Sequence, residues 1–113
     1  MIETIILEAL TEALTVPVYM EAPLSKPERY VLLEKTGTRR EDRLDTATFA
    51  VQSIAAPLLA AAELNEAAKQ AMDQLPYVTE EIFAAKLNSD GNFTDTRTKE
   101  RRYQAVYNIT FKE

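Results

Sequence analysis

The chain has 113 residues, with no cysteine, no histidine, no tryptophan and only two glycines, and its 13 basic and 18 acidic side chains give a formal charge of −5. Without cysteine or histidine it cannot form a disulfide, a zinc–thiolate site or a serine–histidine triad. Gly37 and Gly91 are too few and too far apart for a glycine-rich phosphate loop. We therefore expect no catalytic residue, no cofactor and no metal, and a protein that is not an enzyme.

The overall composition is typical of one folded domain. With 46% apolar and 27% charged residues, the chain can bury a core, and we expect a single domain over residues 1–113. No apolar run approaches the roughly 18 residues of a membrane-spanning helix, and the N-terminus lacks the basic start of a signal peptide. We expect the protein to be made and kept in a cytoplasm, with no membrane partner.

The first predicted element is a helix over residues 2–14, followed by a short edge strand. The apolar residues that recur on one helical face are Ile2, Ile5, Ile6, Ala9, Leu10 and Ala13. Residues 16–20 are rich in β formers, and Pro17 lacks the N–H that a central strand would donate, so this segment suits an edge strand or the entrance of a strand. Pro23 and Pro27 then mark a loop.

A long β-hairpin is predicted next. Strand-like runs at 29–36 and 47–54 flank the polar segment 37–43, in which five of seven residues carry charge and which begins with Gly37. Two such runs around a polar, glycine-containing segment pair antiparallel. We expect a solvated tip and a hairpin that projects beyond the sheet.

The second half predicts a helix over 57–74 and strands over 78–87 and 101–111. Pro57 suits the first turn of a helix, and the last strand alternates apolar and polar residues, so one of its faces is buried. Turn-forming residues at 88–96, including Gly91, separate the two strands. The predicted fold class is α+β, with two helices packed on an antiparallel β-sheet, a protruding hairpin and the order α-β-ββ-α-ββ.

The polar segments contain residue types that could serve three kinds of chemistry. A calcium loop starting at Asp90 fails, because Asp95 falls where the loop needs glycine and Arg101 where it needs a glutamate. No pair of carboxylates is singled out for glycoside hydrolysis. Grouped basic residues near Tyr103 suit nucleic acid, but interleaved acidic residues and the negative net charge argue against that partner.

Two charged segments are candidate contact surfaces. Loops of mixed sign suit a rim that meets a complementary rim on another copy of the chain, and a merely solvated loop is the alternative that composition leaves open. The candidate contact residues are Arg39, Arg40, Glu41, Asp42, Arg43, Asp90, Asn92, Asp95, Arg97, Lys99 and Arg101.

Several segments, and the order of the elements, resemble small tail proteins of siphophages and prophages of Gram-positive bacteria. These segments are Val16–Glu21, Tyr30–Gly37, Asp45–Gln52 and Leu87–Tyr107. Over nearly the whole chain the sequence is similar to the tail terminator, or tail-completion, family of minor tail proteins. The shared segments are strands and turns, and none is a catalytic signature.

The resemblance implies a structural virion protein that forms a ring, commonly a hexamer, which caps the tail tube, stops its polymerisation and mediates head–tail joining. Its partners would be further copies of itself, the major tail tube protein and the head–tail connector proteins, and DNA would only pass through the ring lumen. The protein would lie in the virion tail or neck, and in the bacterial cytoplasm during assembly. A head–tail connector or stopper is the alternative neck role, and a nucleic-acid-binding protein is a more distant one.

On this family resemblance, the charged hairpin tip from Gly37 to Asp45 and the segment 88–102 would carry subunit contacts and the rim that faces the tube. Charge reversal at Arg39, Arg40 or Arg101 is expected to weaken ring formation or tail capping without unfolding the subunit, because all three residues lie outside the apolar pattern.

Overall fold

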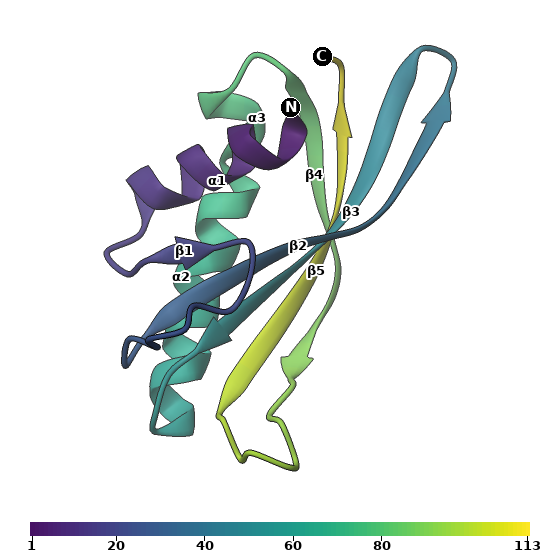
Figure 1. Ribbon diagram of the computed structural model, residues 1–113. Coiled ribbons are helices and arrows are strands. Elements are labelled where there is room, and N and C mark those ends of the chain that lie inside the picture. The colour runs from purple at the N-terminus through teal and green to yellow at the C-terminus, as the bar shows by residue number, and fades with distance from the viewer.

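The computed structural model describes all 113 residues (Figure 1). In chain order its elements are α1 (Ile2–Ala13), β1 (Val18–Tyr19), β2 (Tyr30–Glu41), β3 (Leu44–Ile54), α2 (Leu58–Asp73), α3 (Leu75–Val78), β4 (Ile82–Asn92) and β5 (Arg102–Phe111). The strands form one sheet in the order β1-β2-β3-β5-β4. The α+β class expected from the sequence is confirmed, with both long helices close to their predicted bounds.

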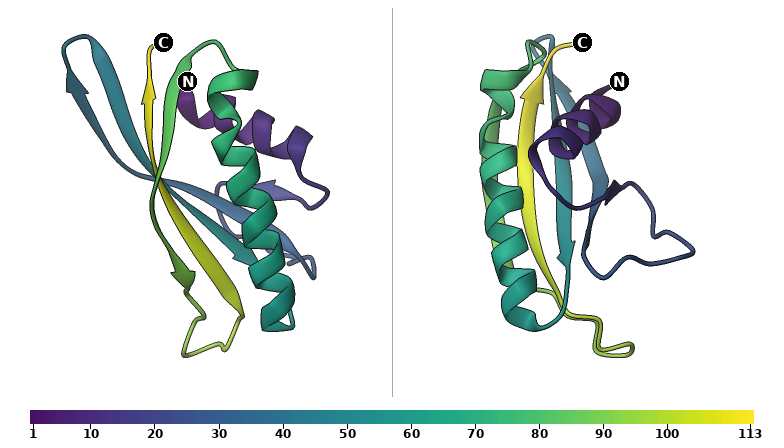
Figure 2. Two further views of the ribbon diagram at one scale, coloured as in Figure 1. Left: turned by 180° about the vertical axis from the view of Figure 1, so that it is seen from behind. Right: turned by 90° about the vertical axis from the view of Figure 1, so that its left-hand side faces the viewer.

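All three helices cover the same face of the sheet (Figure 2). In α1 the buried residues are Ile2, Ile6 and Leu10, which follow one another at four-residue spacing and therefore form a single apolar stripe. In α2 the buried residues include Ala60, Ala61 and Ala68, whose small side chains allow a neighbouring surface to approach the helix closely.

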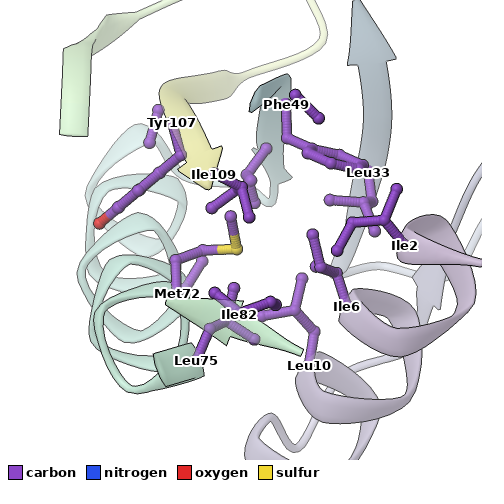
Figure 3. Close-up of a cluster of buried hydrophobic side chains, with 14 of the residues drawn as sticks. Ile2, Ile6, Leu10, Leu33, Phe49, Met72, Leu75, Ile82, Tyr107 and Ile109 are labelled. Atoms are coloured by element: carbon purple, nitrogen blue, oxygen red, sulfur yellow. The ribbon is translucent and has the colours of Figure 1, made fainter. Parts of the chain in front are cut away.

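The core lies between these helices and the sheet. Figure 3 shows Met72 and Leu75 directed toward Ile82, with the α1 side chains on one side and Phe49 and Ile109 of the sheet on the other. Each of these side chains is at most 3% exposed. One contiguous core therefore joins the N-terminal helix to strands from both halves of the chain.

The first strand lies at the edge of the sheet, as its proline predicted. Val31 donates a backbone hydrogen bond to the Pro17 carbonyl at 3.0 Å, so Pro17 takes part in the pairing as an acceptor only. Strand β1 pairs with β2 in parallel, because the long loop between them returns the chain before β2 begins. The sheet is therefore antiparallel, as expected, except for this parallel pair at its edge.

The β2–β3 hairpin projects from the sheet, as expected (Figure 1). Its tip is not the loop that the polar segment 37–43 predicted, because the ladder continues to the pair Glu41–Leu44. Only Asp42 and Arg43 form the turn, and both have positive φ angles, 48° and 71°. Gly37 lies in β2 beside a register shift after Lys35. No helix covers this segment, so its side chains are exposed to solvent and can be polar. Its backbone N–H and C=O groups are satisfied by pairing with β3.

The region after α2 differs most from the prediction. The expected strand at 78–87 begins only at Ile82, because a further helical turn, α3, with Pro76 near its start, follows α2 directly. Strand β4 then continues to Asn92 through the expected turn, and Gly91 pairs with Gln104. Backbone pairing with β5 outweighs the turn preference of these polar side chains.

The face of the sheet away from the helices, here called the open face, carries a ladder of polar side chains. Thr48 donates a hydrogen bond to Asn108 across β3 and β5 at 3.0 Å, and Gln104 accepts one from Gln52 at 3.0 Å. Arg102 adds a bond to Gln52 at 2.9 Å. On the open face, side-chain amides and hydroxyls of neighbouring strands therefore form hydrogen bonds with one another, and no helix covers them.

Candidate subunit-contact surfaces

The hairpin tip, residues 39–45, contains one firmly paired arginine and several free charges. Arg40 contacts Asp45 with two nearly parallel bonds, Nε to Oδ1 at 2.6 Å and Nη2 to Oδ2 at 3.1 Å, and these hydrogen bonds hold the pKa of Asp45 below its ordinary value. Arg39 and Arg43 have no carboxylate within ion-pair distance. The tip as a whole holds three basic and three acidic residues, so its charges balance.

The connection between β4 and β5, residues 93–101, is here called the basic loop. Asp95 accepts backbone hydrogen bonds from Arg97 at 2.8 Å and Thr98 at 3.3 Å, and these bonds lower the pKa of Asp95. Lys99 closes the same turn with a bond to the Asp95 carbonyl at 2.7 Å and a φ of 61°. Asp95, the first of the two acidic residues of this loop, therefore shapes the loop backbone.

The second acid of the basic loop, Glu100, is held by the sheet. It forms an ion pair with Arg102, accepts a hydrogen bond from the buried Tyr30 hydroxyl at 3.0 Å and lies 3.6 Å from Lys26. Burial, followed by the bond to Glu100, raises the pKa of Tyr30 to about 12. The network fixes the base of the loop and compensates the charge of Glu100.

The other charged residues of the basic loop are free. Arg97, Lys99 and Arg101 are exposed and none lies within ion-pair distance of a carboxylate. Phe93, at the start of the loop, is 50% exposed. The loop therefore presents three unpaired cations beside an aromatic ring, although the chain as a whole is acidic.

Asp90, another sequence-predicted contact residue, makes contacts within the subunit. On β4 it accepts hydrogen bonds from Asn65 at 2.7 Å and Lys69 at 2.6 Å, both on α2. Burial works to raise the pKa of Asp90, but the bonds from Lys69 and Asn65 outweigh it and the pKa lies below its ordinary value. These contacts join the helix to β4, and Asp90 is largely occupied within the subunit.

A groove of about 840 Å³ lies between α1, the end of α2, α3 and the start of β4. The apolar residues that line it include Ile5, Ala9, Leu14, Ala71 and Val78, and the acidic residues that line it are Glu8, Glu12, Glu80 and Glu81. No basic residue lines it, and none of the four carboxylates has a cation within ion-pair distance. We call it the acidic groove.

The structure separates the sequence-predicted contact residues into two groups. Arg39, Arg40, Glu41, Asp42 and Arg43 lie on the hairpin tip, whereas Asp90, Asn92, Asp95, Arg97, Lys99 and Arg101 lie on β4 and the basic loop, toward the opposite end of the molecule (Figure 1). The sequence did not single out the acidic groove. Within the sequence, the only local indication of this groove is the pair Glu8 and Glu12, one helical turn apart. The other two acidic residues of the groove, Glu80 and Glu81, are brought near by the tertiary fold.

Two further features bear on what kinds of site the molecule contains. The structure brings together no group of three or more aspartate or glutamate side chains in an arrangement that could hold a metal ion. None of its helices combines the length and the apolar character that crossing a bilayer requires.

Comparisons with known proteins show a similarity of fold to a chain of a solved particle. No protein-family model matches the sequence, and no curated protein matches it. Among solved structures, the fold is similar to a chain described as "Virion of native gene transfer agent (GTA) particle", with a TM-score of 0.51 and 16% sequence identity. The similarity covers 95% of this chain and 84% of that chain. The chain therefore shares its fold with a component of a solved virion.

Proposed function

We propose that this chain is a structural protein of a phage or prophage virion, and more narrowly a tail terminator whose ring caps the tail tube, stops its polymerisation and mediates head–tail joining. The observation that carries the proposal is the fold, which is similar over 95% of the chain to a component of a gene transfer agent virion. The resemblance of four segments to tail terminators narrows the role within the virion. We infer as well that the protein acts by assembly and not by catalysis.

The arrangement of charged surfaces supports a ring. The hairpin tip and the basic loop lie toward opposite ends of a molecule that measures 43 Å along its longest axis and 25 and 24 Å along the others. A subunit with two different contact patches assembles through heterologous contacts, which form a closed ring when the rotation between neighbours divides a full turn. Tail capping requires such a closed assembly, because an open one would extend the tube.

Electron microscopy of particles made with and without the gene tests the proposal. Without the protein we expect overlong tails, and headless tails with irregular ends, and a plasmid-borne copy should restore normal length. Tails of normal length that lack heads would favour a connector or stopper instead. Particles of normal form, together with tight and salt-sensitive DNA binding by the purified protein, would contradict a virion role and favour a nucleic-acid-binding protein.

A further inference from the structure

We propose that the basic loop of one copy docks into the acidic groove of the next copy, so that loop and groove are the two halves of one repeating subunit contact. The proposal rests on the proposed self-assembly and adds to it which surfaces meet. The occupant of the groove is a second copy of this chain, which contacts the groove with residues 93–101.

The acidic groove has the features of an unoccupied contact surface. Glu8 and Glu12 on α1 and Glu80 and Glu81 before β4 line the groove together with apolar side chains, and no basic residue is among the lining residues. A lining with four acidic residues and no basic one is complementary in charge to a cationic partner. The lining also offers apolar area, since Val78 is 64% exposed in the isolated subunit. The groove therefore suits a partner that carries several cations and one apolar side chain.

The basic loop has that composition. Arg97, Lys99 and Arg101 supply three unpaired cations, and Phe93 supplies a half-exposed aromatic ring at the loop's start. Aromatic and arginine side chains are the residues that most often anchor protein interfaces. The hairpin tip is a weaker match, because its basic and acidic residues are equal in number and Arg40 is already paired with Asp45.

The loop is also held in shape before any partner arrives. Asn92 accepts two bonds from Thr94, Asp95 accepts two from the following backbone, and Glu100 ties the loop's end to Tyr30 and Arg102. A segment already ordered in the free subunit loses less conformational entropy on binding than a flexible one. Asp95 and Glu100 are therefore engaged within the subunit, whereas the cations of the loop are free to contact a partner.

The position of the two surfaces makes the contact intermolecular. The basic loop lies at the end of the sheet where β4 meets β5, whereas α3 lies toward the other end (Figure 2). Val78 of α3 is one of the residues that line the groove. A loop cannot reach the groove of its own subunit, so each copy offers a loop to one neighbour and a groove to another. Repetition of this contact is heterologous, as a ring requires.

Paired charge reversal tests the contact. One variant carries Arg97→Glu and Lys99→Glu, a second carries Glu8→Lys and Glu12→Lys, and a matched control carries Arg29→Glu and Lys86→Glu, which alter the same number of charges outside the loop. Sedimentation at low salt, and electron microscopy of tails complemented with each variant, measure self-association and ring occupancy. Circular dichroism checks that each variant is folded.

We expect either reversal to weaken self-association and ring occupancy at least about tenfold, and the control to change them less than about threefold. An equimolar mixture of the two reversed variants should recover self-association beyond dimers, because the reversed loop can meet the reversed groove and the unchanged loop can meet the unchanged groove, so that every contact of an alternating assembly is complementary. A zero-length carbodiimide cross-link from Lys99 to Glu8, Glu12, Glu80 or Glu81, between isotopically light and heavy copies, should appear in the wild type.

Two results would overturn the proposal in distinguishable ways. Rings or oligomers that form normally with both reversed variants, and that give no Lys99 cross-link to the groove, would exclude this contact and leave the proposed ring intact. A wild-type protein that stays a single copy in solution, and that is missing from purified tails, would exclude both the contact and the proposed function.

Discussion

Tyr107 on β5 donates a hydrogen bond from its hydroxyl to Asp73 Oδ1, in the last turn of α2, at 2.8 Å. The tyrosine is only 1% exposed, so its phenol would otherwise be a buried polar group without a partner. The same hydroxyl lies 3.2 Å from the Lys69 carbonyl. This contact fixes the end of the longest helix over the middle of the sheet.

Replacement of Tyr107 with phenylalanine should therefore lower the free energy of unfolding by about 1–2 kcal/mol, because the ring still packs but its bonds to Asp73 and Lys69 are lost. Urea denaturation followed by circular dichroism measures the change. Tyr103→Phe is the matched control, since the Tyr103 hydroxyl makes no hydrogen bond in the structure. A loss for Tyr107→Phe no larger than for Tyr103→Phe would contradict the role of the bond.

Alkaline pH should lower the free energy of unfolding, because the pKa values of two tyrosines are raised in the folded protein. Burial, and then the bond to Glu100, raises the pKa of Tyr30 to about 12, and burial followed by the bond to Asp73 raises the pKa of Tyr107 further still. Above pH 10 the unfolded chain loses phenolic protons that the folded chain keeps, so stability falls as the pH rises. The fall should be at most about 1.4 kcal/mol per pH unit for each of the two residues.

Urea midpoints between pH 9 and pH 11.5 measure this dependence. Tyr107→Phe should make the curve shallower, because one of the two linked protons is then absent. An unchanged slope in that variant would show that the tyrosine does not titrate with unfolding.

Asp90 should contribute to stability and not to assembly. Asp90→Ala removes the acceptor for Asn65, which is 1% exposed, and should cost about 1–3 kcal/mol of unfolding free energy. Asp90→Asn should cost less, because an amide oxygen can still accept from Asn65. Glu63→Ala, on an exposed position of α2, is the control and should have little effect.

Acid pH gives a second readout for the same residue. Because the pKa of Asp90 is lowered in the folded state, its contribution is present above its ordinary pKa of 3.8 and is lost as the pH falls through the lowered value. Asp90→Asn should remove that part of the acid dependence. Asp90 variants that fold normally but fail to assemble would contradict the structural role.

The turn of the β2–β3 hairpin should tolerate glycine better than arginine. Arg43 has a φ of 71°, in the left-handed region where a side chain costs about 1 kcal/mol relative to glycine. Arg43→Gly should therefore raise the thermal midpoint. Thr38→Gly, in the strand of the same hairpin, should lower it, because glycine weakens a strand interior. A thermal midpoint that falls in Arg43→Gly would show that the arginine side chain stabilises the hairpin in another way.

Arg39→Glu should weaken tail capping while leaving the subunit folded. Arg39 is exposed and without an ion pair, so its reversal disturbs no contact within the hairpin. Arg40→Glu is a less clean test, because it would place two carboxylates together at Asp45. Tail lengths in complemented lysates measure capping, and thermal denaturation checks the fold. Normal tails with Arg39→Glu would remove the hairpin tip from the contact surfaces.

The parts of the fold that the sequence predicted are those encoded by local repetition. The four-residue spacing of Ile2, Ile6 and Leu10 predicts α1, and the alternation from Tyr103 to Phe111 predicts β5 and its buried face. The projecting hairpin was also predicted, since its apolar strands flank a charged segment. Each of these patterns lies within about a dozen residues of chain.

The missed features depend on partners far away in the chain. Residues 88–92 have turn-forming side chains, yet they extend β4 because β5 offers a free edge. Strand β1 runs parallel to β2 only because of how the intervening loop returns. The acidic groove joins Glu8 to Glu80, which are separated by most of the chain. The sequence could identify the charged loops as candidate surfaces, but it could not identify the acidic groove into which we propose that the basic loop docks.

The polar ladder on the open face has a consequence for folding. Apolar alternation repeats every two residues, so a two-residue slip of β3 along β5 would keep the same side chains in the core. That slip would place Gln52 opposite Val106 in one direction, and Thr48 opposite Val106 in the other, in place of their partners Gln104 and Asn108. The core alone would accept more than one register of β3 against β5. The amide and hydroxyl pairs favour the observed register, in which the charged segments lie at the two ends of the sheet.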